Sequence, residues 1–281
     1  MDDFLSYGKY EPTGFMLKLI DVVSNLPDNW IGRRSAFFLR SFAMVFLKRK
    51  PVDIERFGAK MRLFPSGNAC EKRILFTPQY FDREEFDILK QYIEEKQDGF
   101  CFVDVGANIG IYSLFAANCA HNGARILAVE PQSVIFDRLI YNIQQNSQGY
   151  IKAVSCAVAD KTGEITLFIN YRDRGRSSIR IVDTAQGSSV RVPSVTLLEL
   201  LNKENFSGMD ILKLDVEGAE DLILSLFFQD APESLYPELI MIENARKLWQ
   251  AEIPTLLEKN GYRFLKKTRT NLIFERKMGS L

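Results

Sequence analysis

The sequence predicts an α/β fold: a doubly wound, mostly parallel sheet that ends in an antiparallel hairpin and follows an N-terminal helical and hairpin extension. Two observations carry this prediction. From residue 100 onward, short apolar runs alternate with segments of helical periodicity, which is typical of a parallel sheet with helices on both faces. Near the end, residues 262–265 and 271–275 are strand-like, and their short polar connection allows antiparallel pairing only.

The extension is expected to cover residues 1–98. Its helices are predicted at 15–26, 33–49 and 82–96, with a β-hairpin at 53–64. The last helix follows Asp82, and Glu85 stands three residues later, which is the spacing of a capping box.

The segment 33–49 allows two interpretations. It is rich in phenylalanine and has basic residues at both ends, but Arg40 interrupts the apolar stretch, which is too short to span a bilayer. Helical periodicity favours a helix that docks on the core. The alternative is peripheral contact of residues 33–50 with an anionic membrane surface.

The second part of the chain, residues 99–281, is expected to hold the sheet. Its parallel strands are predicted at 102–105, 125–129, 150–158, 210–215 and 238–243, and its helices at 108–119, 132–146 and 218–228. A strand-rich insertion at about 163–197 interrupts this alternation.

Composition excludes several classes of protein. Lys plus Arg equals Asp plus Glu at 36 each, so no net charge favours nucleic acid, and we expect none as a partner. There are four cysteines without metal-ligand spacing and one histidine, so we expect no metal site. The acidic start lacks a signal-peptide pattern, and no apolar run has membrane-spanning length, so we expect a cytoplasmic protein, with the inner membrane face as its alternative location.

The strongest site signal is the glycine loop at residues 103–111. A buried strand ends at Gly106, where the backbone can turn sharply and a ligand can approach, and Asn108 is expected to cap the next helix. Free amides at a helix start favour a carboxylate, while Asp104 on the strand favours an ammonium group, directly or through water. The pairing suits a zwitterionic ligand better than a pyrophosphate.

Glu130 ends the neighbouring strand, where a carboxylate can accept both hydroxyls of a ribose. The main rival is an NAD-dependent oxidoreductase, whose fingerprint is G-x-G-x-x-G. Asn108 takes the place of the middle glycine and would crowd a pyrophosphate, so this alternative is the weaker one.

Three further carboxylates are expected at the same edge of the sheet. Asp215 and Glu217 follow the strand at 210–215, and Glu243 ends the next one. Lys213 is either a strand residue that extends to solvent or a partner of one of these acids. Glu217 has a second interpretation as a helix cap.

The motifs at 104–110, at Glu130-Pro131 and at 212–220 resemble the FkbM family of S-adenosylmethionine-dependent methyltransferases, which implies a Rossmann-like methyltransferase fold and this cofactor for residues 99–281. The resemblance implies binding of the methionine part by Asp104, Gly106, Asn108 and Gly110. It further implies that Glu130 holds the ribose and that Ala157 and Asp160 border the adenine. Many members have Asp after the Thr-Leu that opens a short helix, where this chain has Leu198.

The family associates with O-methylation of sugars, lipids and polyketides, so we expect a hydroxyl-bearing small molecule or glycan as substrate. Four arginines lie at 171–180, and because guanidinium groups bind carboxylates and phosphates, we expect that the acceptor can be anionic. A hydroxyl needs a base as its proton leaves, and we expect Asp215 first, then Glu243, with Glu217 as the third candidate. The alternative class is a non-catalytic cofactor-binding module that regulates or scaffolds a partner.

Overall fold

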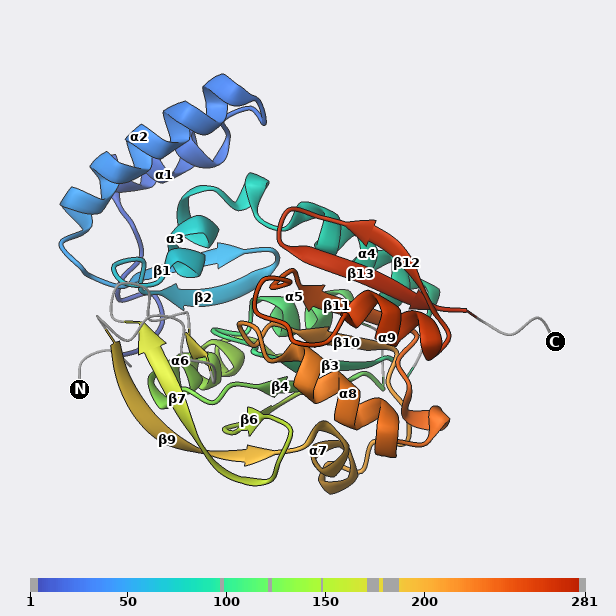
Figure 1. Cartoon of the computed structure of the whole chain (residues 1–281). Helices are drawn as coiled ribbons and strands as arrows, with labels where there is room; N and C mark the ends of the chain where they lie inside the picture. The colour runs from blue at the N-terminus through green and yellow to red at the C-terminus, as the bar shows by residue number, and fades with distance from the viewer. Residues whose placement is uncertain are drawn as a thin grey trace.

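The computed structural model describes residues 5–96, 99–120, 123–147, 149–170, 177–178 and 187–277. Within this part of the chain, a seven-stranded sheet has the order β12-β13-β11-β10-β3-β4-β5 (Figure 1). Its strands are β3 (Cys101–Val105), β4 (Arg125–Val129), β5 (Ile151–Val154), β10 (Ile211–Leu214), β11 (Leu239–Glu243), β12 (Tyr262–Lys267) and β13 (Asn271–Arg276). Strands β11, β10, β3, β4 and β5 are parallel, and β13 runs antiparallel to both β11 and β12. The predicted α/β class and the final antiparallel hairpin are confirmed.

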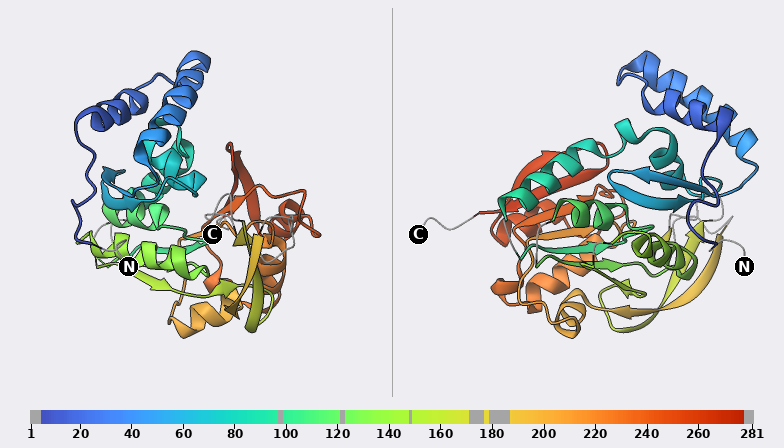
Figure 2. Two further views of the ribbon diagram at one scale, coloured as in Figure 1. Left: turned by 90° about the vertical axis from the view of Figure 1, so that its left-hand side faces the viewer. Right: turned by 180° about the vertical axis from the view of Figure 1, so that it is seen from behind.

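Helices cover both faces of this sheet, as the two views of Figure 2 show. One face carries α4 (Arg83–Glu95), α5 (Ile111–Cys119) and α6 (Ser133–Gln144); the other carries α7 (Leu197–Lys203), α8 (Glu220–Asp230), the 3-10 turn η4 (Glu233–Leu235) and α9 (Ile253–Lys259). Successive side chains of β3 alternate between the two cores: Phe102 belongs to the first, and Val103 and Val105 to the second. Burial on both faces explains why the strands appear in the sequence as continuous apolar runs.

The insertion forms a second sheet of β6 (Ala157–Val158), β7 (Gly163–Asn170), β8 (Ser177–Ser178) and β9 (Gly187–Val195). The expectation of one strand over 150–158 is therefore wrong. The chain pairs with the main sheet only as far as Val154, whose carbonyl accepts a hydrogen bond from the Glu130 amide. From Ala157 it pairs with the second sheet, where Ala157 lies opposite Ser194 of β9. Both halves are apolar, so hydrophobicity did not mark the change of sheet.

The N-terminal elements are α1 (Gly14–Ser24), α2 (Trp30–Leu47), β1 (Val52–Arg56), β2 (Ala59–Leu63), α3 (Ala69–Phe76) and the 3-10 turn η2 (Pro78–Tyr80). The predicted hairpin is present, and a buried Arg62–Asp53 ion pair of 2.7 Å joins its two strands. Buried residues of these elements and of the first sheet face belong to one core. The extension therefore contributes to the body of the protein that holds the site.

One local expectation in this region is wrong, and another holds only in part. Asp82 has a left-handed backbone (φ 36°), and its side chain makes no capping bond. Glu85 is buried and accepts from the Thr268 hydroxyl and, at 2.8 Å, from the Asn271 amide, so it joins α4 to the final hairpin instead of closing a capping box. The core-docking interpretation of 33–49 is confirmed for the helix, since Ala36, Ala43 and Leu47 belong to the first core, but its phenylalanines are exposed.

Candidate active site

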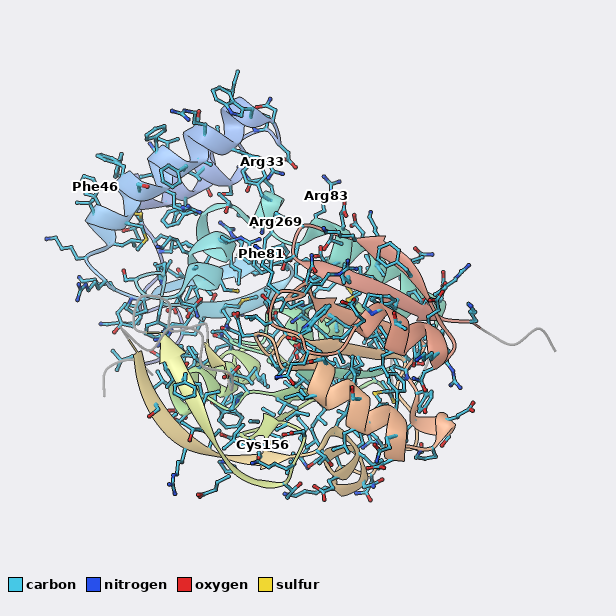
Figure 3. The ribbon with its side chains drawn as sticks, viewed as in Figure 1. Arg33, Phe46, Phe81, Arg83, Cys156 and Arg269 are labelled. Carbon is cyan, nitrogen blue, oxygen red and sulfur yellow. The ribbon has the colours of Figure 1, made fainter. Side chains whose placement is uncertain are left out.

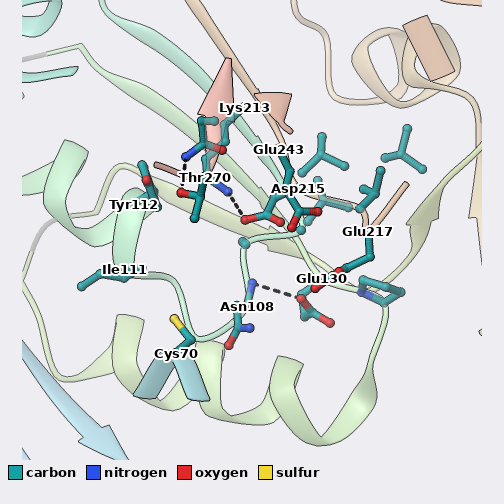
Figure 4. A pocket seen from close by; sticks show the side chains of 18 of the residues that line it. Cys70, Asn108, Ile111, Tyr112, Glu130, Lys213, Asp215, Glu217, Glu243 and Thr270 are labelled. Carbon is teal, nitrogen blue, oxygen red and sulfur yellow. Dashed lines mark hydrogen bonds and ion pairs between the residues drawn. The ribbon is translucent and has the colours of Figure 1, made fainter. Parts of the chain in front are cut away.

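A cavity of about 380 Å³ opens at the carboxyl ends of β3, β4, β10 and β11 (Figure 4). Residues from the glycine loop, from the strand ends and from the N-terminal elements line it together. The polar residues of its wall are Asn68, Arg73, Asp82, Asn108, Tyr112, Glu130, Lys213, Asp215, Glu217, Glu243, Thr270 and Asn271. The carboxyl edge of a parallel sheet is the usual ligand site of such folds.

The glycine loop is shaped by a close approach of two backbones. Gly106 has φ 82°, and a Cβ at this position would lie 2.0 Å from the backbone carbonyl oxygen of Asp215. The close approach expected at Gly106 is thus made by the loop after β10. It holds the glycine loop and Asp215 in fixed relation at the cavity wall.

Asn108 and Gly110 differ from expectation. The N-cap position of α5 is Gly110, and Asn108 lies in the preceding turn with φ 51°, so the predicted capping role of Asn108 is wrong. Asn108 lines the cavity, and its backbone amide donates to Glu130. Gly110 lies outside the cavity wall, where an added Cβ would meet Leu139 of α6 at 2.5 Å.

Glu130 is buried at the end of β4, and both of its carboxylate oxygens accept backbone hydrogen bonds. Oε2 accepts from the Asn108 amide at 3.0 Å, and Oε1 from the Gln132 amide at 2.9 Å. Burial raises the pKa of Glu130 to about 7, although these two hydrogen bonds oppose the shift; Asp104 and Asp215 add to it. Each oxygen retains a second lone pair with which it can accept from a ligand hydroxyl.

Asp104, Lys213 and Asp215 form a charged group on adjacent strands. Lys213 lies beside Asp104 in the β10–β3 register; its ammonium is 2.9 Å from Asp215 Oδ2 and 3.9 Å from Asp104 Oδ1. Burial favours the neutral amine, but Asp215 and Asp104 outweigh it, so the pKa of Lys213 is raised. Of the two interpretations of Lys213, the structure supports pairing with acids.

Asp104 is fully buried behind the cavity wall, where the Ser113 hydroxyl donates to its Oδ2 at 2.7 Å. Burial raises the pKa of Asp104, and Lys213 opposes that shift. When both acids are ionised, they exceed the single ammonium by one negative charge. That excess suits a cationic ligand group, and Asp215, with its side chain 39% exposed, presents it to the cavity.

Two of the other predicted acids also reach the cavity. Glu243 ends β11 and Glu217 lies in the loop before α8, where it has a left-handed backbone of φ 56°. The capping interpretation of Glu217 is wrong, because Glu220 accepts the Val216 and Gly218 amides of this loop, and its other oxygen accepts from Trp249.

Another part of the wall comes from residues for which the sequence indicated no role in the site. The Lys213 ammonium lies 4.6 Å from the ring centre of Tyr112 in α5. The Tyr112 hydroxyl donates a hydrogen bond of 3.1 Å to Asp82. Burial, with help from Asp82, raises the pKa of Tyr112 well above its usual value, so it stays a hydrogen-bond donor. Asp82 also contacts Arg73 at 3.1 Å and Arg269 at 3.8 Å.

Of the remaining predicted features, only Ala157 is part of the cavity wall in the described residues. Ala157 lines the cavity, whereas Asp160 is exposed and outside it. Leu198 lies in α7, packed against the second core, so the family position that it occupies does not line the cavity. The arginines of 171–180 fall outside the described residues. Among the residues that are described, no group of three His, Cys, Asp or Glu side chains could hold a metal ion.

The fold is that of the Rossmann-like methyltransferases. The solved METTL16 methyltransferase domain has the same fold, with a TM-score of 0.50 at 15% identity over 98% of this chain and 96% of that one. The family model described as "Methyltransferase FkbM domain" matches residues 104–264, and the chain belongs to this family. The match leaves the oxidoreductase alternative without support.

Two curated relatives have related sequences. Methyltransferase sdnD of Sordaria araneosa is 30% identical over 42% of this chain and 56% of its own length. The 31-O-demethyl-FK506 methyltransferase FkbM of Streptomyces tacrolimicus is 26% identical over 56% of this chain and 69% of its own length. The chain thus matches little more than half of the first relative.

Proposed function

We propose that this protein binds S-adenosylmethionine in the described cavity and methylates a hydroxyl oxygen of a small molecule or glycan. The observation that carries the proposal is the meeting of the glycine loop, Glu130 and the Asp104–Lys213–Asp215 group at one cavity. The name of the Streptomyces relative denotes an O-methyltransferase, which supports oxygen as the proposed methyl acceptor.

The residues present suit this cofactor on chemical grounds. Glu130 accepts hydrogen bonds from the ribose diol through its remaining lone pairs. The turn from Gly106 to Asn108 and the carboxylate of Asp104 hold the methionine part of the cofactor. Asp104 is buried behind the cavity wall, so it acts through intervening groups. Gly110 supports the loop through its packing on Leu139, and Ala157 borders the adenine. When bound, the cofactor supplies an electrophilic methyl group on a cationic sulfur.

Asp215 is the proposed base, and Glu243 is the second candidate. Lys213 holds Oδ2 of Asp215, which leaves Oδ1 to take the proton that the acceptor hydroxyl loses. The ion pair with a buried lysine also fixes the direction of the carboxylate, so alignment of the reactants is the main contribution of the protein. Glu217 also lines the cavity, and its proposed role is to contact the acceptor.

The acceptor is proposed to enter between α3, Asp82 and the β12–β13 connection. There Asp82 contacts two guanidinium groups, that of Arg73 in the cavity wall and that of Arg269, which lies outside this wall and is also influenced by Glu85. An anionic group on the acceptor would pair with these guanidinium groups. Acidic acceptors are therefore expected to react better than neutral ones of the same size, and Arg269→Gln should reduce that preference.

Methyl transfer from labelled cofactor to a panel of sugars, lipids and polyketides tests the proposal. Asp215→Asn or Glu243→Gln should lower turnover about a hundredfold or more, because the hydroxyl loses its base. Glu258→Gln, on the exposed side of α9, is the matched control and should leave turnover unchanged. EDTA should have no effect.

Near-normal turnover in both variants would exclude these two bases. If the parent binds cofactor but transfers methyl to no acceptor of the panel, the non-catalytic alternative gains support.

A further inference from the structure

The N-terminal helices α1 and α2 form a hairpin that exposes many large apolar side chains although it packs on the core. The buried residues of α2 are Gly32, Ala36, Ala43 and Leu47, and the partly buried Leu39 and Met44 pack against the same core. The other large apolar residues of α2 are exposed: Trp30, Ile31, Phe37, Phe38, Phe42, Val45 and Phe46. Successive positions place these exposed residues on one broad side of the helix, and Trp30 is 72% exposed.

The exposed side continues onto α1. Phe15 of α1 packs edge-on against Phe42 and Phe46 of α2, with ring centres 6.4 and 5.7 Å apart, and all three rings are exposed. In Figures 1 and 2 the two helices stand at one end of the molecule, apart from the central sheet, and Figure 3 shows Phe46 on the outer side. A continuous aromatic surface of this kind on a folded protein marks an interaction site.

On α2 and the segment that follows it, the charge of this surface is of one sign, whereas α1 adds one exposed residue of each sign, Lys18 and Asp21. Six basic residues and no acidic residue lie between Trp30 and Pro51. Arg33 is neutralised by Asp28 at 2.6 Å, and Arg40 is half-buried, which lowers its pKa. The exposed cations that remain are Arg34, Lys48, Arg49 and Lys50.

The hairpin is attached to the wall of the cavity. The Tyr80 hydroxyl of η2 donates to the carbonyls of Leu26 and Pro27 between the two helices, at 3.0 and 2.7 Å, and Arg33 lies over the Tyr80 ring. The next residues, Phe81 and Asp82, line the cavity. Whatever the hairpin binds is therefore held near the entrance for the acceptor.

We propose that the α1–α2 hairpin docks on an anionic phospholipid bilayer. The aromatic side would lie at the boundary of headgroups and acyl chains, and the four exposed cations would contact anionic headgroups, as in helices that lie in the membrane plane. Tryptophan and basic residues are the side chains that favour this boundary. Within the described residues, no helix has the length and apolar character needed to cross a bilayer, so the contact is with one surface.

Charge decides against a second copy of the chain as the occupant. A twofold interface would bring this same side of two copies together, so the cations Arg34, Lys48, Arg49 and Lys50 of one copy would lie on the same surface as those of the other. Like charges in such an interface oppose association. An anionic lipid surface supplies the opposite charge at every position.

Co-sedimentation of the full chain with phosphatidylcholine vesicles, with and without phosphatidylserine, tests the proposal. The parent should bind the vesicles that contain phosphatidylserine and dissociate at high salt. Replacing Arg34, Lys48, Arg49 and Lys50 with Gln should weaken binding about a hundredfold or more. The matched control replaces four exposed lysines elsewhere with Gln and should bind as the parent does: Lys90, Lys161, Lys203 and Lys259.

The aromatic contribution has its own readout. Trp30 fluorescence should shift to the blue when vesicles are added, and Trp30→Phe should remove that shift because Trp249 is remote from the hairpin. Phe38→Ser with Val45→Ser should weaken binding at least tenfold, whereas the exposed pair Val134→Ser with Phe264→Ser should not.

Three results would overturn the proposal: no binding of the parent to anionic vesicles, equal binding of the charge variant and its control, or a parent dimer that Phe38→Ser with Val45→Ser converts to monomers. These measurements require no methyl transfer, so they stand apart from the outcome for the proposed activity.

Discussion

Replacement of Lys213 tests the electrostatic structure of the site. Its ammonium is the cation that lies between buried Asp104 and cavity-facing Asp215, at 3.9 and 2.9 Å. Lys213→Met nearly keeps the length of the side chain and removes the charge. Asp215 can then be solvated from the cavity, but Asp104, which is fully buried, cannot.

The expected loss of stability follows from this difference. Removing one partner of a buried ion pair costs about 3–5 kcal/mol, because the other charge is left uncompensated. Since Asp215 is partly exposed and relaxes, we expect the lower end, about 3 kcal/mol, from Asp104 alone. The second change Asp104→Asn removes the stranded charge, so Lys213→Met with Asp104→Asn should regain most of that loss.

Urea unfolding at neutral pH gives the free energy of unfolding of both variants. The control is Lys203→Met at an exposed position, which should change this free energy by about 0.5 kcal/mol or less. Because burial raises the pKa of Asp104 in the folded state and Lys213 opposes that rise, the single variant should recover stability as the pH falls and Asp104 takes up a proton. A single variant as stable as the parent, or a double variant no better than the single one, would refute this account of the charged group.

Four further outcomes are expected. Gly106→Ala should weaken cofactor binding and stability together, because its Cβ would collide with the Asp215 carbonyl; unchanged calorimetric affinity would contradict this. Gly110→Ala should cost about 1–3 kcal/mol of folding stability through strain and the contact with Leu139, yet leave the affinity of the folded protein within about threefold. Because the pKa of Glu130 is raised to about 7, the folded state binds more protons than the unfolded state, so stability should fall as the pH rises from about 5 to 8. Cofactor affinity should rise about tenfold over the same interval, because the ionised form accepts the diol; Glu130→Gln should flatten both profiles.

The sequence predicted much of the site because the topology of a parallel sheet gathers it. Glu130, Asp215 and Glu243 each follow or end a parallel strand, and carboxyl ends of parallel strands lie at one edge. The same reasoning could have found Asn271, since an antiparallel strand begins where its parallel neighbour ends, and Asn271 pairs with Glu243.

The remaining residues depended on packing between distant segments. Asp82 and Arg73 reach the cavity because α3 and α4 fold back over the sheet, and no local pattern marks that arrangement. The roles of Glu85 and Glu220 were hidden for a related reason. Glu85 has the spacing of a capping box and Glu220 carried no prediction of its own, but the partners that decide their roles, Asn271 and Trp249, lie far along the chain.

The same limit applies to α2. Helical periodicity located the helix but did not show which side faces the protein, since Gly32 and Ala36 on one side and Phe38 and Val45 on the other all fit an apolar pattern. The decision came from packing of the small residues, which permits a close approach of backbones that a phenylalanine would prevent.

Calorimetric titration of S-adenosylmethionine into the parent and Glu130→Ala tests the central claim most directly. The parent should bind, and the folded variant should bind about 2 kcal/mol more weakly, near thirtyfold, because charge-assisted hydrogen bonds to the ribose are lost. Asp137→Asn, at an exposed position of α6 outside the cavity, should bind as the parent does. Equal affinity of parent and Glu130→Ala, or a parent that binds NAD and not S-adenosylmethionine, would contradict the account.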